Sequence, residues 1–356
     1  MHLTTLTIRD FRNLAALDVE LPSSGVVVLG ENGQGKTNLL EAIYYLVLFR
    51  SMRGAKDREL VRFSTEGFFV GGTADRHVTA GYQVSGRRKK VTVDGVEVRK
   101  LTEAVGKITA VLFSPEDRSI VAGGPAGRRR FLDILLALTH AGYLSALASM
   151  RAGLRQRNAA LRRGKPTEAQ AFDQQLARCS SQIASARREW VGHWRARYAA
   201  LTAELGEAGS AVLSYHAHRQ RDDDDVETFL RELGAALESD LQRGMTTVGP
   251  HRDDLRLMLD RHDLRRFGSA GQQRTAAVAL RLLETAALTD ALGTPPIALY
   301  DDVFAEFDAE RQANLLRLIQ NTLPGQAIIA APRESEVPAA LLDRPRWEMR
   351  LGSIAT

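Results

Sequence analysis

Residues 30–37 read Gly-Glu-Asn-Gly-Gln-Gly-Lys-Thr, which is a complete Gly-x-x-x-x-Gly-Lys-Thr phosphate-binding loop. A short apolar run, 26–29, precedes the loop, as expected of a strand buried on both faces. The segment that follows, 37–43, has the composition and apolar spacing of a helix. The loop is therefore predicted to lie between a strand and a helix N-terminus, where backbone N–H groups and the helix dipole face an anion. The sequence predicts that this chain binds a nucleoside triphosphate.

Each residue type in the loop suits contact with a phosphate. The glycines let the backbone wrap the anion without a Cβ in the way. The Lys36 ammonium can reach the β- and γ-phosphates, and the Thr37 hydroxyl can ligate Mg²⁺. We therefore assign ATP binding to the whole loop, that is, to Gly30, Glu31, Asn32, Gly33, Gln34, Gly35, Lys36 and Thr37.

Two carboxylates follow a second buried apolar strand. Residues 297–300 read Ile-Ala-Leu-Tyr, and Asp301 and Asp302 come directly after them. At the end of the strand, Asp301 could hold Mg²⁺ opposite Thr37, directly or through water. Asp302 is placed to polarise an attacking water as general base. The alternative is a strand that ends in a turn with two aspartates, which the phosphate-binding loop upstream disfavours.

Residues 269–272 read Ser-Ala-Gly-Gln at the predicted start of another helix. The Ser269 hydroxyl, the unobstructed backbone of Gly271 and the helix dipole also suit a phosphate, and Gln272 completes the motif. A hydrolase nucleophile elbow, Gly-x-Ser-x-Gly, is excluded because Phe267 stands where its first glycine would be. Taken alone, the pattern is better explained as a serine N-cap.

The charge of the chain points to a nucleic-acid partner. Its 48 Lys and Arg outnumber 43 Asp and Glu, and the pI is about 9.5. A general enrichment in arginine is one explanation, but clustering favours phosphate recognition. Four basic groups stand out: Arg50, Arg53, Lys56, Arg58 and Arg62; residues 87–90; residues 128–130; and Arg151, Arg155, Arg157, Arg162 and Arg163.

The sequence favours a cytoplasmic protein without a membrane segment. The single cysteine, Cys179, permits no disulfide framework. The N-terminus lacks the basic and apolar pattern of a signal peptide. The longest apolar stretch, 43–49, is too short to span a bilayer.

The pattern of expected helices and strands changes twice along the chain, which predicts an α/β fold interrupted by a helical lobe. Residues 1–115 read as α/β with many strands, including a hairpin turn at Asp94-Gly95. Residues 116–245 are expected to form an all-helical arm, in which two helical runs joined at 164–166 make an antiparallel hairpin. Residues 246–356 return to α/β, with strands expected at 255–259, 297–300 and 327–330.

The order of these motifs resembles ABC-type ATPase heads of the branch shared with SMC proteins, and most closely the RecF recombination-repair ATPases. The resemblance covers residues 3–330. It is carried by Ile-Arg-Asp-Phe-Arg-Asn at 8–13, the loop and helix at 33–43, Phe-Ser-Pro-Glu-Asp at 113–117, Gly124-Pro125 with 128–133, Gln-Arg-Asn-Ala-Ala-Leu at 156–161, Gly-Pro-His-Arg-Asp-Asp-Leu at 249–255 and Asp-Asp-Val-Phe-Ala-Glu-Phe-Asp at 301–308.

The resemblance implies a homodimer that forms head to head on ATP. Each site would combine the loop and Asp301/Asp302 of one subunit with Ser269, Gly271 and Gln272 of the other. Arg12 matches a position near the α-phosphate. The resemblance further implies ATP-coupled binding to DNA gaps, weak DNA-stimulated hydrolysis, and work with RecO and RecR that directs RecA onto single-stranded gaps, with a part in the SOS response.

Two positions depart from the pattern of related ATPases. Ala330 and Ala331 stand where a hydroxyl or imidazole often senses the γ-phosphate, and Ala270 stands where arginine is common. The alternative function is an SMC-like structural protein that tethers DNA or partners, and the short arm disfavours it. A transporter subunit is disfavoured because the helical insertion is long and arginine-rich.

Overall fold

The apolar run that precedes the phosphate-binding loop forms β3 (Gly25–Leu29), an inner strand of a six-stranded sheet. A computed structural model describes residues 1–219, 223–304, 308–322 and 325–355. Its contacts divide the chain into two units, which we describe separately. Unit 1 contains Met1–Asp117, Glu204–Gly206 and Leu280–Thr356, and unit 2 contains Arg118–Ala203 and Glu207–Ala279.

The sheet that carries β3 has the order β15-β14-β3-β13-β12-β8. All neighbouring pairs are parallel except β14 and β15. Its central strands β3 and β13 carry no polar side chain, as expected of strands covered on both faces, and β12 is apolar up to Asp301, whereas β14 alternates exposed charged residues with buried apolar ones. Besides β3, the strands of this sheet are β8 (Ala110–Phe113), β12 (Ile297–Asp301), β13 (Ala327–Ala331), β14 (Arg346–Arg350) and β15 (Ser353–Ala355). The strands expected at 297–300 and 327–330 are confirmed.

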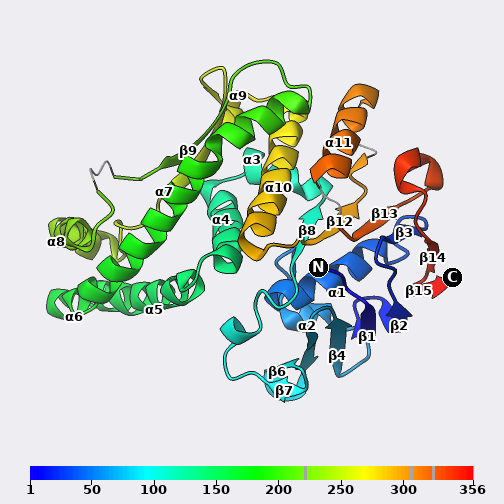
Figure 1. The fold of residues 1–356 in the computed structure, drawn as a ribbon. Helices are drawn as coiled ribbons and strands as arrows, with labels where there is room; N and C mark the ends of the chain where they lie inside the picture. Colours follow the sequence, from blue (N-terminus) through cyan, green and yellow to red (C-terminus); the bar gives the residue numbers. More distant parts are fainter. Residues whose placement is uncertain (220–222, 305–307, 323–324, 356) are drawn as a thin grey trace. The chain divides into compact units, whose positions relative to one another are not determined.

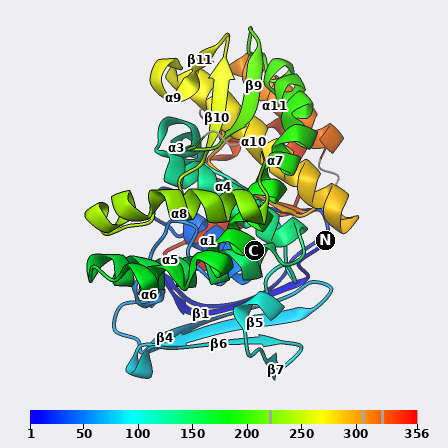
Figure 2. The same cartoon turned by 90° about the vertical axis from the view of Figure 1, so that its left-hand side faces the viewer.

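The second sheet of unit 1 is antiparallel, with the order β2-β1-β4-β5-β6-β7. The hairpin predicted at Asp94-Gly95 joins β6 to β7, and both turn residues have positive φ. Helix α1 (Lys36–Leu48) contacts strands of both sheets and lies between them (Figure 1). Figure 2 shows the antiparallel sheet from another side, with β1, β4, β5 and β6 at the bottom of the view. The strands are β1 (Thr5–Phe11), β2 (Leu14–Glu20), β4 (Gly67–Thr73), β5 (His77–Gln83), β6 (Arg88–Val93) and β7 (Val96–Glu97), and the other helices are α2 (Asp57–Leu60) and α11 (Ala309–Thr322).

Unit 2 is built mainly from helices (Figure 1). The two expected helical runs are present, but the first is divided in two at residues 140–142 and the second begins with a separate short helix. The helices are α3 (Arg118–Ala122), α4 (Pro125–Thr139), α5 (Tyr143–Arg162), α6 (Pro166–Gln170), α7 (Asp173–Glu204), α8 (Val226–Arg243), α9 (Leu264–Phe267) and α10 (Ala270–Leu292). Helices α7 and α10 continue past the boundaries of the unit.

The segment 116–245 is not entirely helical, which corrects the expectation of an all-helical arm. Strand β9 (Ala211–His216) lies within it and pairs with β10 (Asp254–Leu259), which in turn pairs with β11 (His262–Asp263). Because β9 is a short strand paired with residues about 40 positions later, its formation depends on tertiary contacts that local pattern does not reveal. The strand expected at 255–259 is confirmed.

The two units do not follow the boundaries that we drew from sequence. By compactness, residues 246–279 group with the helices of unit 2 and not with the head. Our sequence-based division assigns 1–115 and 246–356 to the ATPase head and 116–245 to the arm. It describes functional parts and not compact units, and it stays a prediction. Within the described part of the chain, no helix combines the length and the apolar character needed to cross a membrane.

Candidate functional site

The phosphate-binding loop connects β3 to α1 in unit 1. Gly33 and Gly35 have φ of +82° and +118°, in the left-handed region that favours glycine. A side chain at Gly35 would also collide with Asn13. The Lys36 side chain is buried, and its Nζ lies 2.6 Å from the Gly30 carbonyl oxygen. The ammonium is therefore held inside the curve of the loop, where the phosphates are predicted to bind.

The parallel sheet brings Asp301 to the start of α1. β12 and β3 both pair with β13, so their carboxyl ends meet at one edge of the sheet. The Thr37 hydroxyl donates a hydrogen bond of 2.9 Å to Asp301 Oδ1. Burial raises the pKa of Asp301 to about 6, although the hydrogen bond from Thr37 opposes the shift. The Thr37 hydroxyl and the Asp301 carboxylate thus lie side by side, and burial disfavours the negative charge of that carboxylate.

Asp302 is a half-buried carboxylate in an unusual backbone conformation. Its φ is +51°, and its Oδ1 is buried without a hydrogen-bond partner among the described residues. Burial raises the pKa of Asp302; Lys36 opposes this shift, and the charges of Glu336 and Glu116 add to it. A carboxylate with raised pKa is a better proton acceptor near neutral pH, which suits the predicted general base.

The oxygen atoms of Thr37 and Asp301 fit a magnesium ion. Mg²⁺ prefers oxygen ligands and is usually bound through one or two protein groups together with substrate phosphates and water. Among the residues that the structure describes, no group of three or more His, Cys, Asp or Glu side chains could hold a metal by itself. The arrangement therefore suits an ion that arrives with a nucleotide.

The structure places Arg12 beside α1 but engages its side chain within the chain. Arg12 Nε lies 3.0 Å from the buried Glu41 carboxylate, and another guanidinium nitrogen donates to the Glu59 carbonyl oxygen. The Glu41 carboxylate also accepts a hydrogen bond from the Ser51 hydroxyl. The predicted contact of Arg12 with an α-phosphate stays a prediction.

Residues that sequence analysis missed hold the loop in place. Asn13 donates from Nδ2 to the Gln34 carbonyl oxygen at 3.1 Å and accepts from Asn38 at 2.8 Å. The backbone N–H groups of Leu351 and Gly352 donate to Gln34 at 2.6 and 2.8 Å. The turn between β14 and β15 is thereby fastened to the loop. Beside it lies a pocket of about 630 Å³ lined by Leu29, Gly30, Glu31, Gln34, Pro332, Arg333, Glu334 and residues 348–351.

The Ser-Ala-Gly-Gln segment opens α10 in unit 2 and forms a reciprocal cap. Ser269 Oγ accepts from the Gln272 backbone N–H at 3.2 Å, and Gln272 Oε1 accepts from the Ser269 N–H at 2.9 Å. Ser269 is exposed, and the Phe267 ring is 69% exposed. Gly271 is half-buried. The segment is therefore a helix cap on an accessible surface, and its predicted phosphate contact is untested.

Two further sequence features lie at the ends of β12 and β13. Ala330 and Ala331 are buried at the end of β13, so the apolar departure from related ATPases lies at this edge of the sheet. Of the block at 301–308, Ala305, Glu306 and Phe307 lie outside the described residues.

Comparisons with known proteins agree with this arrangement. Residues 2–344 match the family RecF/RecN/SMC N terminal domain. The chain is 38% identical to the DNA replication and repair protein RecF of Anaeromyxobacter dehalogenans, over 100% of this chain and 99% of that protein. It is 36% identical to RecF of Pediococcus pentosaceus, over 97% of this chain and 96% of that protein.

The chain belongs to the RecF family. A solved structure of the recombination mediator protein RecF with ATP, in the RecFOR pathway, matches it with a TM-score of 0.90 at 29% identity, covering 99% of this chain and 97% of that chain. The Smc head domain of Pyrococcus furiosus shares the fold alone, with a TM-score of 0.57 at 13% identity. These matches confirm the predicted ATPase-head fold.

Two sequence blocks that carry the RecF resemblance are structural in unit 2. Arg157, from the Gln-Arg-Asn block, is fully buried and pairs with Asp173 and Asp240. In the Gly-Pro-His-Arg-Asp-Asp-Leu block, Asp254 accepts both hydrogen bonds of a bidentate pair from the buried Arg128. The sequence predicts that the basic groups at 128–130 and at 151–163 recognise phosphate. This prediction is wrong for Arg128 and Arg157, because each is buried and paired with carboxylates of the same chain.

Proposed function

We propose that this RecF-family chain is an ATP-dependent DNA-binding protein of recombinational gap repair. It dimerises on ATP at DNA in the cytoplasm, hydrolyses ATP weakly with stimulation by DNA, and helps RecO and RecR to load RecA, with roles in replication restart and the SOS response. The contact between Thr37 and Asp301 carries the proposal, because it joins the phosphate-binding loop to the carboxylate strand in one site. The full-length similarity to DNA replication and repair proteins supports the pathway.

The residues of unit 1 have distinct tasks in this proposal. The backbone of the loop and the Lys36 ammonium bind the phosphates, and Asp302 accepts a proton from the attacking water. Thr37 and Asp301 would hold Mg²⁺, which neutralises phosphate charge when it is bound. Ser269, Gly271 and Gln272 would complete the site of a second copy, which makes hydrolysis depend on the dimer.

The Lys36→Met variant tests the nucleotide site. Lys36 is the only side-chain cation of the loop, so we expect the variant to lose most ATP affinity in calorimetric titration and to remain a folded monomer with ATP in gel filtration. A matched control, Lys107→Met, removes an exposed lysine of the same unit and should leave both properties unchanged. Equal ATP affinity in wild type and Lys36→Met would refute the assignment.

Assembly is tested with the wild-type chain. Gel filtration and crosslinking should report a dimer with ATP and gapped DNA, and a monomer without nucleotide. A chain that binds ATP but never dimerises would contradict the composite site while leaving nucleotide binding in place.

A further inference from the structure

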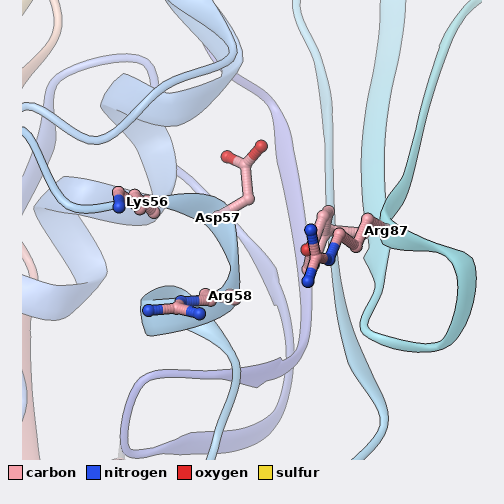
Figure 3. Close-up of a pocket in the computed structure, with 5 residues that line it drawn as sticks. Lys56, Asp57, Arg58 and Arg87 are labelled. Carbon is pink, nitrogen blue, oxygen red and sulfur yellow. The ribbon is translucent and has the colours of Figure 1, made fainter.

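Two basic segments that are separate in sequence converge on one pocket of unit 1. The pocket has a volume of about 300 Å³ and is lined by Lys56, Asp57, Arg58, Tyr82 and Arg87. Figure 3 shows Lys56 and Arg58 at the start of α2 and Arg87 on the turn between β5 and β6. These are the first two of the four basic groups in the sequence, and in contrast to Arg128 and Arg157 their pocket cations lie on the surface.

The single carboxylate of the pocket is already neutralised from within. One Asp57 oxygen accepts a hydrogen bond from the Tyr45 hydroxyl at 2.8 Å, and the other lies 2.8 Å from Lys89 Nζ. Lys89 also donates to the Phe49 carbonyl oxygen and lies over the Tyr45 ring. In Figure 3 the Asp57 carboxylate points away from Arg58. Asp57 therefore offsets the charge of Lys89 and forms no ion pair with Lys56, Arg58 or Arg87.

The three pocket cations are available to a ligand. Lys56, Arg58 and Arg87 are exposed, and none forms an ion pair with a carboxylate in the described ranges of the chain. The neighbouring Arg88 and Lys90 do pair, both with Glu97. The pocket thus collects three positive charges that form no ion pair with a carboxylate of the described residues.

The chemistry of the pocket favours phosphate over base recognition. Its one aromatic ring, Tyr82, is only 8% exposed and offers no surface for base stacking. Guanidinium and ammonium groups bind phosphate oxygens, and such contacts are independent of base sequence. The geometry points to a site for backbone phosphates of DNA, held by Lys56, Arg58 and Arg87. This inference rests on the proposed function and adds to it the surface that DNA contacts.

The test measures the affinity of the full chain for a fluorescein-labelled duplex with a single-stranded gap, in ATP, across a series of salt concentrations. The pocket variant combines Lys56→Gln, Arg58→Gln and Arg87→Gln. The control variant, Arg99→Gln with Lys100→Gln and Lys107→Gln, removes the same charge from exposed positions of unit 1 outside the pocket. A single Arg87→Gln variant provides a milder change at an exposed turn.

Each lost phosphate contact lowers the slope of log affinity against log salt by about 0.9. We expect the pocket variant to lose about 2 to 3 units of slope, Arg87→Gln to lose about 1, and the control variant to lose less than 1. Calorimetric ATP affinity should stay unchanged in all three.

A parallel titration with inorganic tripolyphosphate tests whether the pocket takes a free anion instead of DNA. Three results would overturn the DNA site while the proposed function stands: an unchanged slope in the pocket variant, equal losses of slope in the pocket and control variants, or loss of tripolyphosphate binding by the pocket variant with unchanged DNA binding. The last result would assign the pocket to a free anion. Failure of the wild-type chain to bind gapped DNA at any salt concentration would instead overturn the proposed function, and this inference with it.

Discussion

At the scale of single residues, burial of the Asp301 carboxylate at the end of β12 lowers the stability of the folded protein near neutral pH. Asp301 is 5% exposed and has a pKa of about 6, well above its ordinary value of 3.8. Below pH 3.8 the group is protonated in folded and unfolded chains alike and costs nothing. As the pH rises from 3.8 to 6, the unfolded chain ionises more readily, so the folded state loses stability.

Asp301→Asn should therefore stabilise the nucleotide-free protein at pH 7. The gain is on the order of 1–3 kcal/mol, because one pKa unit corresponds to about 1.4 kcal/mol. Urea unfolding at pH 7 and at pH 4 measures it, and the gain should shrink at the lower pH. The same variant should weaken magnesium-dependent ATP binding. Equal stability of variant and wild type at pH 7 would show that burial does not penalise the charge.

Asp302→Asn should slow hydrolysis and spare ATP binding. Asparagine tolerates the positive φ of this position, so the backbone should be retained. Removing a general base typically costs 10²–10⁴-fold in rate. Phosphate release in single-turnover assays measures the change, with calorimetric ATP affinity as the control. Unchanged turnover would transfer the role to another base, such as Glu116.

At the scale of elements, buried ion pairs join the helices of unit 2. Arg157 of α5 contacts Asp173 at the start of α7 at 2.8 Å and Asp240 of α8 at 2.6 Å, and it donates to the Thr246 hydroxyl. Arg157 and Asp240 are both fully buried. One guanidinium thus connects three helices, of which α8 is distant in sequence from the other two.

Arg157→Ala should destabilise the protein by about 3–5 kcal/mol, because it leaves buried carboxylates without their cation. Arg155→Ala removes an exposed arginine from the same helix and should change stability by less than about 0.5 kcal/mol. Thermal and urea unfolding compare the two. A loss for Arg157→Ala no larger than that for Arg155→Ala would exclude the buried pairs as a source of stability.

Helix length also bears on the alternative function. The longest helix, α7, has 32 residues, which corresponds to about 48 Å at 1.5 Å per residue. Tethering between distant DNA segments requires far longer arms, so this element favours a local switch on DNA.

At the scale of the whole molecule, the central expectation is a site shared between two copies. Ser269 caps α10 on an exposed surface of unit 2, whereas the phosphate-binding loop belongs to unit 1. A change at Ser269 therefore leaves the loop of the same chain intact.

Ser269→Arg should retain normal ATP affinity, abolish the ATP-dependent dimer and reduce hydrolysis to background, because its bulk would occupy the proposed interface. DNA binding in ATP should fall to its nucleotide-free level. Ser269→Ala controls for the lost cap, which costs about 1 kcal/mol of stability without adding bulk. Dimerisation of Ser269→Arg on ATP in gel filtration would reduce Ser269 to a helix cap and refute the shared site.

Local sequence was sufficient for the phosphate-binding loop, its flanking strand and helix, and the strand that ends in Asp301. Each of these features is contiguous in sequence, so local pattern reveals it. A strand, eight loop residues and a helix N-terminus together already form an anion site. The hairpin turn at Asp94-Gly95 was predictable for the same reason, since its positive φ angles depend on two adjacent residues.

Tertiary structure alone decided which cations are free. Arg128 and Arg157 look like surface phosphate ligands in sequence, yet each is buried against carboxylates from distant segments. Lys56 and Arg87 lie 31 positions apart and meet in one pocket because α2 packs near the β5–β6 turn. A charged side chain has the same local pattern whether it is paired or free, since its partner is chosen by the fold.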